Sequence, residues 1–106
     1  MIPIKFSYQK LESFNEVWAL LDALNAKTPK QKAMLSAMQE LAVKFKRKQL
    51  NLEYAYTPSK TYRLKLKAHE AYFLEMYLRD ALKDMGFGYT RTIVHGIADD
   101  INQKLA

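Results

Sequence analysis

The sequence predicts a single α+β domain over residues 1–106, with a small antiparallel sheet packed against four helices in the order (β)ααββαα. Apolar residues recur at the helical period in four segments, and between the second and third of these they alternate one by one. Only three glycines and three prolines are present, which leaves little room for long loops. A two-layer arrangement is the simplest way to cover the apolar face of such a sheet.

The first half of the chain begins with a short edge strand over residues 2–6, where Pro3 is tolerable. A helix is expected from about residues 7–10 to about Ala26, because its apolar positions share one helical face. Thr28 and Pro29 open a second helix as its N-cap and first residue, and this helix is expected to end near Lys48.

The middle of the chain predicts a central β-hairpin. Residues 50–56 and 61–67 alternate apolar and polar side chains, and residues 57–60 supply a Pro-Ser turn between them. In the expected register Leu52 lies opposite Leu66 on the face of the sheet that packs against the helices. Asn51 lies opposite Lys67 on the solvent-exposed face.

Two helices complete the domain. The third is expected over residues 68–85, with Gly86 as its left-handed C-cap. Its apolar stripe is wide, which is typical of a central helix or of one buried in an oligomer interface. The fourth, over residues 89–105, has a narrow isoleucine stripe, and Gly96 beside that stripe would let another backbone approach closely.

Several classes of protein are excluded by composition. The chain has no cysteine, so disulfide scaffolds, thiolate metal sites and cysteine nucleophiles are absent. No segment approaches the ~18 consecutive apolar residues of a membrane span. No signal peptide is recognisable at the start, so we expect a cytoplasmic protein without membrane contact.

Motifs for catalysis or metal binding are missing or incomplete. His69 and Glu70 resemble half of a zinc-protease motif, but Phe73 stands where the second histidine belongs. His95 and Asp99 are four residues apart on the last helix and are more often a surface pair than a catalytic one. We therefore predict no enzyme activity, no cofactor, no metal site and no small-molecule substrate.

The positive charge is concentrated in one segment. The chain carries 17 Lys and Arg against 11 Asp and Glu, a formal net charge of +6. Residues 27–67 hold eleven of the basic residues and only two acidic ones, so this segment is +9 and both flanking segments are slightly acidic. A concentrated field of this kind is informative about binding partners.

The basic segment predicts a candidate site where the second helix meets the hairpin. Five or six convergent cations suit a phosphate backbone. The plainer interpretation is that these residues complement a helix dipole and protect a strand edge. The candidate basic patch comprises Lys44, Arg47, Lys48, Arg63, Lys65 and Lys67.

Two functional hypotheses follow, both for a non-enzymatic module. The first is protein–protein contact, with an acidic protein surface or with a second copy of the chain as the partner. The alternative is nucleic-acid binding through phosphate-backbone contacts at the basic patch. In size and style the chain is similar to small accessory proteins of phages and conjugative elements, but no motif supports this likeness. The candidate dimer interface comprises Leu78, Leu82, Ile93, Ile97 and Ile101.

Overall fold

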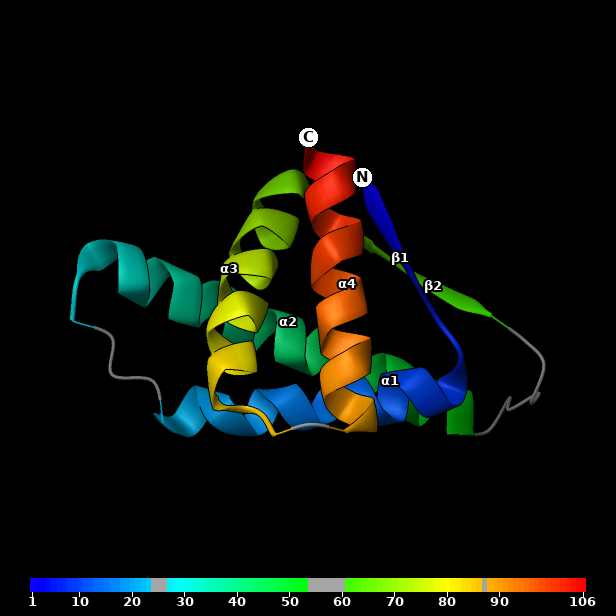
Figure 1. Ribbon diagram of the computed structural model, residues 1–106. Helices are drawn as coiled ribbons and strands as arrows, with labels where there is room; N and C mark the ends of the chain where they lie inside the picture. The colour runs from blue at the N-terminus through cyan, green and yellow to red at the C-terminus, as the bar shows by residue number, and fades with distance from the viewer. Residues whose placement is uncertain (24–26, 54–60, 87) are drawn as a thin grey trace.

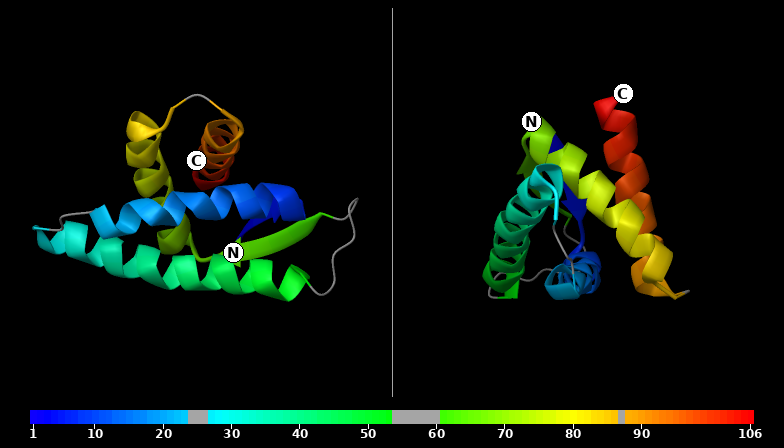
Figure 2. Two further views of the ribbon diagram at one scale, coloured as in Figure 1. Left: turned by 90° about the horizontal axis from the view of Figure 1, so that it is seen from below. Right: turned by 90° about the vertical axis from the view of Figure 1, so that its left-hand side faces the viewer.

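The computed structural model describes residues 1–106 except 24–26, 54–60 and 87. It confirms an α+β fold of helices and a two-stranded antiparallel sheet. The elements in chain order are β1 (Ile2–Phe6), α1 (Tyr8–Phe14), the 3₁₀ helix η1 (Asn15–Ala23), α2 (Pro29–Glu53), β2 (Tyr62–Leu66), α3 (Ala68–Asp84) and α4 (Tyr89–Leu105). Helices α3 and α4 lie side by side, and the α1–η1 segment and α2 run across them (Figures 1 and 2).

The predicted hairpin is wrong over residues 50–53, because these residues form the last turn of α2. Leu52 is buried and continues the helical stripe of Leu41 and Phe45, whereas Leu50 is 58% exposed. The alternation that suggested a strand is therefore a short stretch of a helical pattern. The rest of the predicted first strand, 54–56, and its turn, 57–60, lie outside the described residues.

Strand β2 pairs instead with the N-terminal strand β1. Ile4 lies opposite Leu64, and Phe6 lies opposite Tyr62. These four side chains are buried, so one face of the sheet belongs to the core. The strands predicted at 2–6 and 61–67 are both present, the second as β2 over Tyr62–Leu66. Their pairing with each other was not predicted.

Two lysine side chains donate hydrogen bonds to backbone carbonyls on the two outer edges of the sheet. Pro3 and Lys65 lie opposite each other. Lys104 Nζ donates to the Pro3 carbonyl at 2.7 Å, and Lys44 Nζ donates to the Lys65 carbonyl at 2.8 Å. Both carbonyls therefore point away from the partner strand, as in a non-hydrogen-bonded pair of an antiparallel ladder. Pro3, which has no N–H, loses no ladder bond at this position.

The expected first helix is divided at Asn15, where α1 ends and the tighter helix η1 begins. Asn15 Nδ2 donates to Gln49 Oε1 at 2.7 Å, and Asn15 Oδ1 accepts a hydrogen bond from Trp18 Nε1 at 2.9 Å. Both bonds are made by the asparagine side chain, and the Asn15 backbone N–H still bonds to the Leu11 carbonyl as the C-cap of α1. The Asn15 side chain thus attaches the junction of α1 and η1 to α2.

An aromatic cluster joins these elements. The rings of Phe14 and Phe45 are 5.2 Å apart, and Trp18 stacks on Tyr77 at 5.7 Å with an interplanar angle of 10°. Tyr77 also donates its hydroxyl to the Val17 carbonyl at 2.6 Å, and burial raises the pKa of Tyr77 to about 12. Helix α3 is therefore fixed to η1 by both stacking and a buried hydrogen bond.

Helix ends explain two further differences from the sequence predictions. Gly86 is not a left-handed cap, since among the described residues only Gly88 has a positive φ, at 154°. The C-terminal end of α3 is capped instead by Arg91, whose guanidinium donates to the carbonyls of Leu82 and Met85. Gly88 is the N-cap of α4, with a φ that strongly favours glycine.

Candidate functional site

Helix α2 supplies half of the predicted basic patch. The helix begins as expected, because the Gln31 backbone N–H donates to Thr28 Oγ1 at 3.1 Å and Gln31 Oε1 accepts from the Thr28 N–H at 3.2 Å. Lys44, Arg47 and Lys48 follow at spacings of three and four residues, which place them on one flank of the helix. All three line a shallow depression beside Leu64 of β2.

Strand β2 supplies the other half. Arg63 and Lys65 alternate with the buried Leu64, so their side chains emerge on the exposed face of the sheet. The hydrogen bond from Lys44 Nζ to the Lys65 carbonyl connects α2 directly to this strand. Lys67 follows the strand and is exposed at the start of α3. The expected neighbour of Lys67, Asn51, lies instead beside Leu64.

A seventh cation, which the sequence reasoning missed, comes from β1. Lys5 is the direct partner of Arg63 in the sheet, so the two side chains share its exposed face. The predicted hairpin would have placed Ala55 opposite Arg63. That register gave no reason to include Lys5 in the patch. The alternation of Ile2, Ile4 and Phe6 was the available signal. We call the following seven residues the basic surface: Lys5, Lys44, Arg47, Lys48, Arg63, Lys65 and Lys67.

The charges on the basic surface are not matched by ion pairs among the residues that the structure describes. Within the described part of the chain, none of its seven side chains takes part in an ion pair. Lys5 and Arg63 are like charges directly across a strand pair, an arrangement that destabilises a sheet. Glu40 lines the same depression as Lys44, and Glu70 accepts from the Lys67 backbone N–H, but neither carboxylate forms an ion pair with these cations. The surface keeps a net positive charge, which attracts anions from solution.

Charges on α3 and α4 are arranged in the opposite way. Arg79 Nη2 lies 2.9 Å from Asp99 Oδ1 and 3.3 Å from Glu75 Oε2. The hydrogen bond to Asp99 raises the pKa of Arg79, with a smaller contribution from Glu75. His95 Nδ1 also reaches Asp99 Oδ2 at 3.2 Å, so the predicted His95–Asp99 contact is confirmed. We call this group, with Lys83–Asp80 and Lys104–Asp100, the paired face.

The predicted dimer interface lies inside the folded chain. Leu78 and Ile101 are 0% exposed, and the other three residues are at most 9% exposed. Helices α3 and α4 make the most extensive contact between any two elements, and these side chains lie within the core that the two helices share. Most of the wide stripe of α3 is thus covered within one chain, although Tyr72 at its margin is 50% exposed. The interface residues concerned are Leu78, Leu82, Ile93, Ile97 and Ile101.

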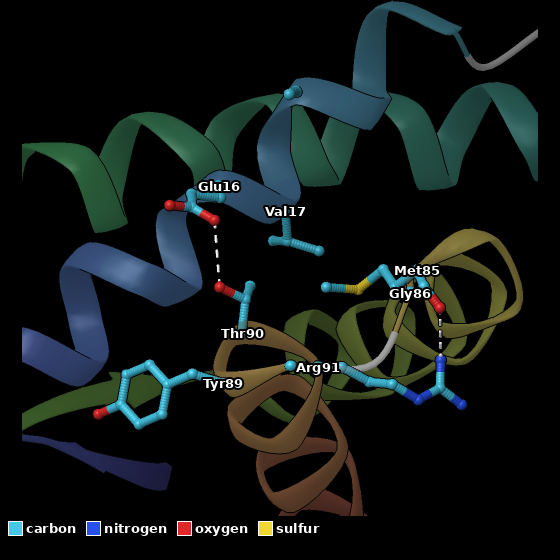
Figure 3. Close-up of a pocket in the computed structure, with 9 residues that line it drawn as sticks. Glu16, Val17, Met85, Gly86, Tyr89, Thr90 and Arg91 are labelled. Atoms are coloured by element: carbon cyan, nitrogen blue, oxygen red, sulfur yellow. Dashed lines mark hydrogen bonds between the residues drawn. The ribbon is translucent and has the colours of Figure 1, made fainter.

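Polar groups elsewhere in the described chain form hydrogen bonds between elements of the fold. Around the pocket of Figure 3, Thr90 Oγ1 donates to Glu16 Oε2 at 3.1 Å, and Arg91 caps α3 as described. Across the described ranges, no three His, Asp or Glu side chains are grouped to hold a metal ion. No helix in those ranges combines the length and apolarity needed to cross a membrane.

Comparison with known proteins adds no further information. No protein-family model, no curated protein and no solved structure matches the chain.

Proposed function

We propose that the protein is a non-enzymatic binding module whose basic surface contacts the phosphate backbone of double-stranded nucleic acid. The observation that supports this proposal is the convergence of unpaired cations from α2, β2 and β1. Lys44 links two of these elements through its bond to the Lys65 carbonyl, and Lys5 adds the third through its pairing with Arg63. A cluster of this size matches several consecutive phosphates. Binding would occur in the cytoplasm, the compartment expected from the sequence.

A duplex suits this surface better than a single strand. Proteins that bind single strands stack bases on exposed aromatic rings. The exposed face of the sheet carries Lys5, Arg63 and Lys65, whereas the aromatic residue of β2, Tyr62, is buried. Among the described residues, the more exposed aromatic side chains, Tyr72 and Tyr89, lie on α3 and α4. Contacts to the backbone, without base readout, are what the residues present favour.

An acidic protein surface is the other partner class expected from the sequence, and it would use the same cations. Dimerisation through α3 and α4 has less support, because Leu78 and Ile97 are buried in the single chain. The binding experiment below separates the two partner classes.

Fluorescence anisotropy with duplexes of about 20 base pairs, one of DNA and one of RNA, tests the proposal. With ~4–6 phosphate contacts, the logarithm of the DNA affinity should fall with the logarithm of salt concentration at a slope of about −4 to −5. Comparing the two duplexes distinguishes DNA from RNA as the preferred ligand. Absence of binding to both at low salt would overturn the nucleic-acid proposal and favour the acidic protein surface.

A pair of matched triple variants localises the binding. Lys48→Glu/Lys65→Glu/Lys67→Glu should abolish duplex binding and leave the fold intact, because these side chains are at the surface. Lys27→Glu/Lys30→Glu/Lys32→Glu changes the net charge equally, but at the other end of α2 (Figure 1). The second variant should retain most of the affinity. Equal losses would show that net charge, rather than the basic surface, governs binding.

A further inference from the structure

A groove between β1 and α4 forms a second surface feature, at the outer edge of the sheet rather than on its exposed face. Its volume is about 370 Å³. Four apolar side chains that are largely buried form its floor, and the rim is polar. The floor residues are Ile4, Phe6, Ile93 and Ile97, and the rim includes Lys5, Lys10, Tyr89, Thr92, Gly96 and Asp100.

Nothing in the described part of the chain requires a glycine at position 96, which lines this groove. A glycine inside a helix costs about 1 kcal/mol relative to alanine. The φ of Gly96 is not positive, and a Cβ at this position would meet nothing within 4 Å. Neither backbone conformation nor internal packing therefore requires glycine here. The absence of a side chain keeps the groove open and allows close approach by an atom from outside the chain.

The edge of β1 on the other side of the groove is open at Lys5. Pro3 is in a non-hydrogen-bonded pair, and its carbonyl is occupied by Lys104. Ladder pairs alternate, so Lys5, two residues along, also directs its N–H and C=O away from β2. That direction is toward the groove, which Lys5 lines. An edge of this kind can pair with one more extended segment.

The charge at the rim indicates what kind of segment fits. Within the described residues, the ammonium groups of Lys5 and Lys10 form no ion pair. The one rim carboxylate, Asp100, lies 2.9 Å from Lys104 Nζ and is already neutralised. The rim is therefore positive, above an apolar floor.

We propose that this groove binds an extended acidic segment of a partner protein as a third strand beside β1. The segment exchanges backbone hydrogen bonds with Lys5 and places an apolar side chain against Ile93 and Ile97, close to Gly96. Its carboxylates lie near Lys5 and Lys10. This interaction shares Lys5 with the basic surface, but its other contacts lie on the sheet edge, α1 and α4.

Selection from a library of displayed random heptapeptides tests this proposal, with the full chain as bait. Enriched peptides should alternate apolar residues with Asp or Glu, and their synthetic versions should shift the backbone amide resonances of Lys5 and Gly96. Failure to enrich any sequence, or enrichment of peptides that leave both resonances unchanged, would overturn the proposal.

Variants of the groove make the test specific. Gly96→Leu should fill the groove and weaken the selected peptides at least about tenfold, while its melting temperature stays equal or rises, because leucine is the better helix former. Asn102→Leu adds the same side chain to α4 outside the groove and should leave affinity unchanged. Lys10→Glu, on the exposed surface of α1, should also weaken binding. Unchanged affinity in Gly96→Leu would contradict the proposal.

The triple variant Lys48→Glu/Lys65→Glu/Lys67→Glu keeps the two proposals separate. It should bind the selected peptides as the natural chain does, since none of its substitutions lines the groove. Loss of peptide binding in this variant would mean that the peptides bind the basic surface, which would overturn the groove proposal.

Discussion

The paired face and the basic surface carry charge in two different ways. On the paired face, Arg79 connects α3 to α4 through Asp99, so opposite charges hold two elements of the fold together. On the basic surface, Lys5 and Arg63 face each other across the sheet with no acidic residue between them. Charges of the first kind are used by the fold itself. Those of the second kind oppose folding slightly and remain available to an external anion.

Lys44 and Lys104 link the two regions, since each caps a carbonyl on one edge of the sheet. Lys104 also pairs with Asp100 and so belongs to the paired face. Lys44 has no such partner in the described chain, and its charge adds to the basic surface. One structural role, protection of a strand edge, is thus filled by a neutralised lysine on one side and an unpaired lysine on the other.

The largest expected effect tests whether the α3–α4 region is a core or a dimer interface. Leu78 is 0% exposed within one chain. Leu78→Ala should therefore lower the free energy of unfolding by about 2–5 kcal/mol, measured by urea denaturation. His69→Ala, at an exposed position of the same helix, should change it by no more than about 0.5 kcal/mol. A dimer in the natural chain that Leu78→Ala dissociates without loss of stability would restore the interface hypothesis.

The buried hydroxyl of Tyr77 predicts a pH dependence on the core side of α3. Removing its bond to the Val17 carbonyl in Tyr77→Phe should cost about 0.5–1.5 kcal/mol at neutral pH. Burial raises the pKa of Tyr77 from 10.0 to about 12, so the fold favours the neutral phenol. This contribution to stability is complete below the unfolded pKa and is lost as the pH rises through the folded pKa.

Urea denaturation of both proteins across the alkaline range measures this contribution. The natural chain should lose stability more steeply than Tyr77→Phe between about pH 10 and 12. Parallel curves for the two proteins would show that another group governs alkaline unfolding.

A smaller effect is expected from breaking the paired face. Arg79→Met retains an apolar stem but removes the contacts to Asp99 and Glu75. Because the Arg79 side chain is 39% exposed, the loss should be only about 0.2–1 kcal/mol. The difference should shrink in high salt, as screening weakens the pairs. A loss that is independent of salt would assign the effect to packing of the arginine stem instead.

Most element types were predictable from local sequence, but residues 50–53 and the pairing of strands were not. Thr28 and Pro29 mark the start of α2 by side-chain chemistry within one turn, and the structure has the same start. Leu50 and Leu52 were ambiguous, because a run of alternating residues fits a strand and also part of a helical stripe. Only the contact of Leu52 with the core distinguishes the two, and that contact depends on the whole fold.

The candidate site was likewise predictable only in part. The six predicted cations lie where α2 meets β2, although the reason given from the sequence, a hairpin returning to the helix end, was wrong over residues 50–53. Lys44 reaches β2 through its hydrogen bond to the Lys65 carbonyl. Lys5 was missed because it is 58 residues from Arg63 in the chain, and no local pattern reports a pairing at that separation.

The smallest expected effect separates the cost of the basic surface from its proposed use. Arg63→Thr removes the like-charge pair with Lys5 and introduces a residue that favours strands, so stability should rise by about 0.2–1 kcal/mol. Duplex affinity should fall in the same variant, because one phosphate contact is lost. The control is Lys65→Thr, which makes a similar change on the same strand and face, but opposite the uncharged Pro3. It should lower affinity without the gain in stability, since no like-charge pair is relieved. If both variants were stabilised equally, strand propensity rather than charge repulsion would explain the gain, and the contrast between the two surfaces would lose its energetic basis.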